Sequence, residues 1–122
     1  MKQTLKSSDK LRLKSEFDYV REHGRKFVGG LFILVVAPSP DDKLRCGVIC
    51  GKKYNKKAVT RNRARRLLWE SFRMLKTNLA HAHLVMIPRQ RMMESKQQEV
   101  QEQMQNLFKK SGLSPVLSNL SD

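Results

Sequence analysis

The stretch that most constrains the fold is an amphipathic segment from Asn55 or Lys56 to about Leu79. Its apolar residues recur with a helical period, so at 100° per residue they gather on one side of a helix. This side comprises Ala64, Leu67, Leu68, Phe72, Leu75 and Leu79. The opposite side carries Asn62, Arg66 and Arg73, with Trp69 beside them and Arg65 at the edge. The segment therefore predicts the longest helix of the protein, buried along one face and basic along the other.

Upstream of this helix, the sequence predicts one helix and an antiparallel pair of strands. A capped start at Ser15 and a stop at Gly24 indicate a helix over residues 15–23. Residues 27–37 predict a central strand, in which Gly29-Gly30 marks a bulge or a close backbone approach. After a turn at residues 38–42, residues 44–50 return as the second strand of a hairpin.

Downstream, residues 84–88 predict a third strand and residues 94–111 a last helix. The apolar face of that helix comprises Val100, Met104, Leu107 and Phe108. The order αββαβα in 122 residues predicts an α+β fold with a single domain over residues 1–122. We expect its core to span about residues 10–112, between a mobile basic N-terminal arm (1–12) and a mobile C-terminal tail (113–122).

The chain is strongly basic, and its charge is concentrated in one segment. There are 25 Lys and Arg residues and 11 Asp and Glu residues, which give a formal net charge of +14. Residues 51–76 hold ten basic side chains and one acidic side chain, a net charge of +9. A charge that served only solubility would be spread over the chain, so this concentration indicates a surface for a polyanion.

The sequence also excludes several classes of protein. The longest apolar run, Leu31 to Ala37, has seven residues, whereas a membrane span needs about 18. No apolar region follows the basic N-terminus, so no secretory signal is predicted. If Cys46 and Cys50 lie in one strand, they are about 13 Å apart, which is too far for a disulfide. We expect two buried thiols in a reducing cytoplasm.

The long helix begins in a way that favours anion binding. Lysines crowd its start, where the helix dipole already places positive charge, and such crowding is unfavourable unless an anion docks there. Arginine outnumbers lysine on the helix itself, and a guanidinium group binds phosphate through two parallel hydrogen bonds and stacks on bases. The segment therefore predicts a phosphate-binding surface, although a solvated helix face would also account for a run of charges.

Several parts of the sequence share the pattern of a known family. The triplet Arg61-Asn62-Arg63 follows Lys52-Lys53 and Ala58-Val59, and the segments 13–24 and 84–89 flank it in the right order. The arrangement covers about residues 10–110 and closely resembles the bacterial ribonuclease P protein subunit. This resemblance implies a two-layer α+β sandwich (αββαβα) that is ribosomal-protein-S5-domain-2-like, with a left-handed βαβ crossover against the usual right-handed rule.

The resemblance also implies a function. A catalytic RNA, using Mg²⁺, hydrolyses precursor tRNA to remove its 5′ leader, while the protein subunit contributes no catalytic residue and no metal site. The expected partners are ribonuclease P RNA, at 1:1, and precursor tRNA, in the cytoplasm, with no membrane and no protein partner. RNA binding is assigned to Lys52, Lys53, Lys56, Lys57, Arg61, Asn62, Arg63, Arg65, Arg66 and Arg73. A cleft for the leader is assigned to Phe17, Arg21 and Val35.

Three residues depart from the family pattern. Arg21 and Val35 stand where relatives often carry aromatic residues, and Trp69 stands where an arginine is common. Base stacking contributes about 1–3 kcal/mol per base, so the first two changes weaken stacking on the leader. Arg21 can compensate by stacking its guanidinium group or by pairing with phosphate. For Trp69, stacking on RNA and partial burial at the helix edge are both open.

The remaining candidates for chemistry are weak. His81 and His83 lack a third metal ligand, and Asp41-Asp42 suit a turn. A self-sufficient metal nuclease needs clustered carboxylates, and the basic segment holds a single acid, Glu70. A ribosomal or general RNA-binding protein without a role in cleavage is the alternative function.

Overall fold

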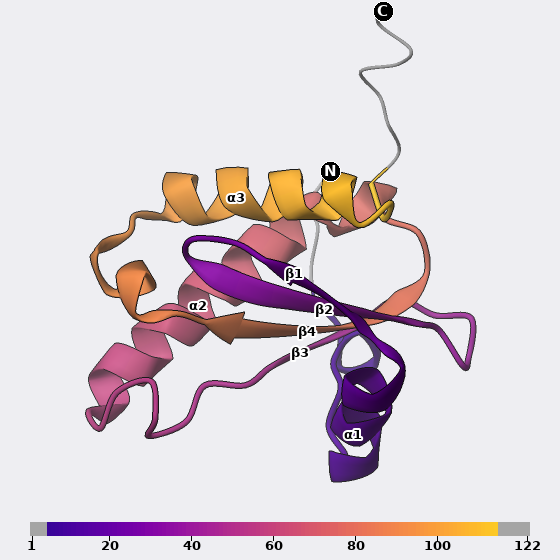
Figure 1. Ribbon diagram of the computed structural model, residues 1–122, viewed down its shortest axis with the longest axis horizontal. Coiled ribbons are helices and arrows are strands. Elements are labelled where there is room, and N and C mark those ends of the chain that lie inside the picture. Colours follow the sequence, from indigo (N-terminus) through magenta and orange to yellow (C-terminus); the bar gives the residue numbers. More distant parts are fainter. Residues whose placement is uncertain (1–4, 115–122) are drawn as a thin grey trace, which may run out of the picture.

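The computed structural model describes residues 5–114, in which helices cover both faces of a four-stranded sheet (Figure 1). The helices are α1 (Lys14–His23), α2 (Ala58–Leu75) and α3 (Gln97–Lys110), with short 3-10 turns η1 (Ser7–Asp9), η2 (Lys76–Asn78) and η3 (Gln90–Glu94). The strands are β1 (Arg25–Val28), β2 (Phe32–Pro38), β3 (Arg45–Val48) and β4 (Ala82–Pro88). Helices α2 and α3 pack on one face of the sheet, and α1 packs on the other.

The sheet has the strand order β1-β2-β4-β3, so the predicted hairpin of residues 27–37 and 44–50 is wrong. Strand β4 lies between β2 and β3, antiparallel to β2 and parallel to β3. Strands β2 and β3 do run in opposite directions, as the turn at residues 38–42 indicates. A turn sets the direction of the chain but not its neighbour, and β4, buried along almost its whole length, takes the position between them.

Gly29-Gly30 forms a turn between two strands rather than a bulge within one. Val28 pairs with Ile33, and the amide of Gly29 donates to the Phe32 carbonyl at 3.0 Å. The side chain of Gln103 on α3 reaches into this turn, where its Oε1 accepts from the Leu31 amide at 2.6 Å. A Cβ on Gly29 would lie 2.5 Å from that oxygen, so a larger residue there would displace the Gln103 side chain. The element order is therefore αβββαβα, not αββαβα.

The predicted apolar faces of the two long helices form the main core. Ala64, Leu68 and Phe72 of α2 are buried, and Leu67 and Leu75 pack against them. On α3 the buried residues are Val100, Met104, Leu107 and Phe108, as predicted. These side chains meet the inner face of the sheet, which includes Phe32, Leu34, Leu84 and Met86.

All three helices begin away from their predicted starts, and α3 begins at Gln97 rather than at residue 94, which ends η3. Helix α2 begins at Ala58, because residues 51–57 form a loop instead of its first turns. Helix α1 has its N-cap at Leu13 rather than Ser15, since the Glu16 carboxylate accepts from the amides of Arg12 and Leu13 at 2.6 and 2.8 Å. This carboxylate takes the place of a side-chain cap, and the two hydrogen bonds hold the pKa of Glu16 below its ordinary value.

Residues 5–12, which the sequence assigns to a basic arm, pack along the β3 edge of the sheet. Leu11 is buried, and its amide donates to the Cys46 carbonyl at 2.9 Å. Lys76 pairs with Asp9 at 3.0 Å. At the other end, Leu113 is buried and its carbonyl accepts from the Ala80 amide. The rest of the predicted arm and tail, residues 1–4 and 115–122, lies outside the described residues.

Cys46 and Cys50 are both buried and unbridged, as predicted. Over residues 5–114, no helix has the length and apolar character that crossing a membrane requires.

Candidate nucleic-acid interface

The loop before α2 carries four lysines and is held by hydrogen bonds. We call residues 51–57 the lysine loop; its cations Lys52, Lys53, Lys56 and Lys57 are all exposed. Tyr54 is buried beneath it, and the Tyr54 carbonyl accepts from Gln90 Nε2 at 2.7 Å. The lysines therefore project from a loop whose backbone is anchored.

The lysine loop leads into a helix terminus with no side-chain cap. Lys57 is the N-cap residue of α2, and its side chain makes no capping hydrogen bond. The first turn of α2 has no acidic residue. Free backbone N–H groups, the helix dipole and exposed lysines thus point to the same place, an arrangement that suits a phosphate group.

Three arginines of α2 donate hydrogen bonds to backbone carbonyls of neighbouring segments. Arg61 Nη1 donates to the carbonyls of Asn55 and Lys56 at 3.0 and 2.8 Å. Arg65 Nη2 donates to the Cys50 carbonyl at 2.6 Å, beyond the end of β3. Arg63 donates to carbonyls at the end of η3, as described below. These arginines tie α2 to its surroundings, a role that the sequence pattern does not distinguish from phosphate binding.

The other predicted RNA-binding residues of α2 differ in the contacts that their side chains make within the protein. Asn62 and Arg66 are exposed, and no hydrogen bond or ion pair joins either side chain to another described residue. Arg73 pairs with Glu70, where its Nε donates to Oε2 at 3.1 Å. This interaction lowers the pKa of Glu70. Arg66 is thus more available to an anion than Arg73.

A groove runs across the sheet face that carries α1. Phe17 and Arg21 of α1 line one hollow of this groove with Val35 of β2, together with Val20, Ile49, Val85 and Ile87. Phe17 and Ile49 also line the next hollow, beside Arg65 and Gly51. Ile49 and Gly51 continue into a third hollow, whose rim carries Lys53, Arg89 and Gln90. Because neighbouring hollows share lining residues, the three form one groove from α1 to the lysine loop. Its floor is apolar and its borders carry cations.

The groove shows which predicted residues lie together and which the sequence missed. Phe17, Arg21 and Val35 do line one hollow, but Val35 is only 7% exposed and contributes little open surface. Arg89 and Gln90 had no assigned role. Their position directly after strand β4, at the edge where the lysine loop also lies, was the available signal.

Comparison with known proteins shows the family of the chain. A family model described as Ribonuclease P matches residues 5–112. The chain belongs to the ribonuclease P protein family. It is 32% identical over 107 residues to the ribonuclease P protein component of an Exiguobacterium species, covering 88% of this chain and 93% of that protein. The Chloroflexus aggregans component is 41% identical over 75 residues, covering 62% of this chain and 55% of that protein.

Solved structures of ribonuclease P proteins share the fold. The Thermotoga maritima protein superimposes with a TM-score of 0.74 at 26% identity, covering 83% of this chain and 96% of that one. The Staphylococcus aureus protein gives a TM-score of 0.79 at 19% identity, covering 88% and 98% of the two chains. The α+β architecture is therefore that of the ribonuclease P protein family.

Trp69, one of the departures from the family pattern, is engaged within the protein. Its ring packs edge-on against Phe72, with centroids 6.2 Å apart. Lys10 Nζ lies 4.8 Å from the indole centroid, within the range of a cation–π interaction. The half-buried Trp69 thus joins α2 to the N-terminal segment, which agrees with its interpretation as an edge aromatic.

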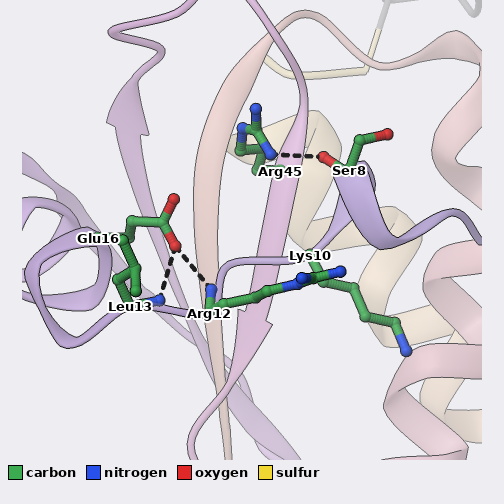
Figure 2. Close-up of a pocket in the computed structure, with 6 residues that line it drawn as sticks. All are labelled: Ser8, Lys10, Arg12, Leu13, Glu16 and Arg45. Carbon is green, nitrogen blue, oxygen red and sulfur yellow. Dashed lines mark hydrogen bonds between the residues drawn. The ribbon is translucent and has the colours of Figure 1, made fainter.

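A second basic hollow lies at the start of α1, apart from the groove. Figure 2 shows its lining of Ser8, Lys10, Arg12, Leu13, Glu16 and Arg45. Its polar groups are largely paired: Glu16 accepts from two amides, and Arg45 Nη1 donates to the Ser8 carbonyl at 2.8 Å. Arg45 Nε also pairs with Asp41 at 2.7 Å. These contacts fasten the N-terminal segment to β3 and α1.

The histidines and turn aspartates form pairs, not a metal site. His83, 3% exposed, contacts Asp41 at 2.9 Å, and His81 lies 3.5 Å from Asp42. Over the described residues, no group of three His, Cys, Asp or Glu side chains is placed to hold a metal ion.

Proposed function

We propose that this chain is the protein subunit of ribonuclease P that binds the catalytic RNA and the 5′ leader of precursor tRNA. The observation that carries the proposal is that a basic surface adjoins an apolar groove in a member of this family. The lysine loop and the uncapped start of α2 adjoin an apolar groove bordered by Arg21, Arg65 and Arg89.

Phosphate neutralisation is the proposed role of the basic surface. The lysine loop and the exposed Arg66 bind phosphates of the catalytic RNA near the point where the precursor tRNA is cleaved. Each neutralised phosphate releases condensed counterions, so binding weakens steeply with salt. By lowering repulsion between the two RNAs, the protein reduces the Mg²⁺ concentration that cleavage needs.

The groove is the proposed path of the leader. An apolar floor that includes Phe17, Ile49 and Ile87 accommodates bases of a single strand, while cations on the rim meet its phosphates. Sequence-tolerant recognition of this kind suits a substrate whose leader varies. Arg21 on α1 supplies a guanidinium group where relatives often carry an aromatic ring.

The proposed division of labour leaves hydrolysis to the RNA. The RNA would hold the Mg²⁺ that such metal-assisted hydrolysis uses, and the protein contributes binding and orientation. We expect one protein per RNA, acting in the cytoplasm.

Reconstitution tests the proposal. The purified chain is mixed with ribonuclease P RNA and precursor tRNA at a Mg²⁺ concentration too low for the RNA alone. Cleavage at the mature 5′ end should appear with the complex and not with the protein alone. A protein that binds the RNA without restoring cleavage would be a general RNA-binding protein instead, and cleavage by the RNA-free protein would contradict the proposal.

A further inference from the structure

The lysine loop is anchored from two separate elements. From α2, Arg61 Nη1 donates to the carbonyls of Asn55 and Lys56. From η3, Gln90 Nε2 donates to the Tyr54 carbonyl. Three consecutive carbonyls in the middle of the loop are thus bound by side chains that lie outside it.

The loop is also braced internally. The Tyr54 amide donates to the Gly51 carbonyl at 3.0 Å, and the Lys57 amide donates to Asn55 Oδ1 at 2.8 Å. The first contact closes a turn over residues 51–54 and the second closes a turn over residues 55–57, so the two turns include the bound carbonyls. With its backbone held in this way, the loop has little freedom to lose when its lysines meet a ligand.

The element that carries Gln90 is tied to α2 by Arg63. Arg63 Nη1 donates to the Met93 carbonyl at 3.1 Å, and Arg63 Nη2 donates to the Ser95 carbonyl. Asn55 Nδ2 adds a contact of 3.7 Å to Met93 Sδ. Hydrogen bonds therefore run from α2 to η3, from η3 to the lysine loop, and from the loop back to α2.

We propose that Arg61, Arg63 and Gln90 are positioning residues that hold the lysine loop in its RNA-binding conformation before RNA arrives. This inference rests on the proposed function and assigns these three side chains a role through the loop rather than through the phosphates. Arg61 binds both of its carbonyls through Nη1, and a lysine side chain ends one atom short of that position. Arg63 uses both terminal nitrogens, a planar arrangement that a lysine ammonium does not reproduce.

Gln90 gives the sharpest test because it carries no charge. Gln90→Ala should speed amide hydrogen exchange in residues 51–57 of the RNA-free protein. It should also weaken ribonuclease P RNA binding by about 3- to 10-fold, as expected for one lost hydrogen bond. The slope of log affinity against log salt should stay unchanged, since no phosphate contact is removed. Gln98→Ala, an exposed position on α3, is the matched control and should alter neither quantity.

Arg61→Lys provides a second variant that keeps the charge. Faster loop exchange with weaker binding and an unchanged salt slope would support a positioning role. Wild-type exchange and wild-type affinity in Arg61→Lys would contradict it. Weaker binding by Gln90→Ala without faster loop exchange would also contradict it, because Gln90 would then contact the RNA directly.

Failure of the proposed function is distinguishable from failure of this inference. If the wild-type chain does not bind ribonuclease P RNA, the proposed function fails, while the exchange measurements on the free protein still report whether the loop is anchored. If the wild type binds and Gln90→Ala leaves loop exchange unchanged, the positioning role alone is refuted.

Discussion

The ring of Phe17 lies directly against Gly47: a Cβ on this glycine would be 2.5 Å from Phe17 Cε1 and 3.2 Å from Leu11 Cβ. Glycine at this position of β3 lets the first helix approach the sheet closely. The position of the Phe17 ring in the groove thus depends on the absence of a side chain at Gly47, on the strand beneath it.

Gly47→Ala should displace the Phe17 ring and alter the groove while leaving the protein folded. The ring tip can move, so we expect unfolding free energy to fall by only about 1–3 kcal/mol, the usual cost of mild overpacking. The reconstituted complex should lose affinity for leader-bearing precursor tRNA. Gly30→Ala, where a Cβ meets ordinary contact distances, is the control. Unchanged leader affinity in Gly47→Ala would disconnect the Phe17 position from leader binding.

Phe17→Ala should weaken binding of leader-bearing precursor tRNA by about 5- to 160-fold if one base stacks on the ring. Binding of mature tRNA, which has no leader, should change much less. The measurement is the affinity of the reconstituted complex for both RNAs. Equal losses for the two would refute the assignment of Phe17 to the leader groove.

Arg66→Ala should weaken binding of ribonuclease P RNA and reduce the magnitude of the salt slope by about one, because one phosphate contact is lost. Binding is measured between about 50 and 200 mM salt. Lys110→Ala, which removes an exposed cation at the end of α3, should leave the slope unchanged. A wild-type slope in Arg66→Ala would remove this residue from the interface.

Asp41 should make stability depend on pH in the acid range. Partial burial acts to raise its pKa, but hydrogen bonds from His83, Arg45 and Ser39 outweigh this and hold the pKa of Asp41 well below its usual range. The folded state therefore favours the carboxylate, and this stabilisation is complete above the ordinary Asp pKa of about 3.9 and is lost as pH falls further.

Asp41→Asn should consequently destabilise the protein more at about pH 5 than at about pH 2.5, as measured by chemical denaturation. Asp42→Asn is the control, because this side chain is 98% exposed, and its effect on unfolding free energy should depend less on pH. If the difference in unfolding free energy between wild type and Asp41→Asn stays constant from about pH 5 to about pH 2.5, the role of the hydrogen-bonded carboxylate is contradicted.

Local patterns predicted most of the elements, because they depend on residues close in sequence. The spacing of Ala64, Leu68 and Phe72 was enough to identify the buried face of α2. The strand order was not predictable in the same way, since β4 enters between β2 and β3 only after α2 has crossed the sheet. Likewise, Gly29-Gly30 indicated an unusual backbone but not the approach of Gln103 from α3.

The candidate site shows the same limit. The basic run located the surface, but it could not separate Arg66, which is free among the described residues, from Arg61 and Arg63, which hold carbonyls of other segments. Those carbonyls belong to loops whose positions depend on the whole fold. The position of Gln90 after β4 was its only signal, because a neutral side chain acquires its role from the neighbouring Tyr54 carbonyl.

The most direct test of the account compares how tightly the complex of this protein and ribonuclease P RNA binds precursor tRNA with and without its 5′ leader. The protein should increase affinity for the leader-bearing RNA well beyond any increase for mature tRNA, and this preference should shrink in Phe17→Ala. An equal increase for both RNAs would contradict the central claim that the groove beside the lysine loop receives the leader.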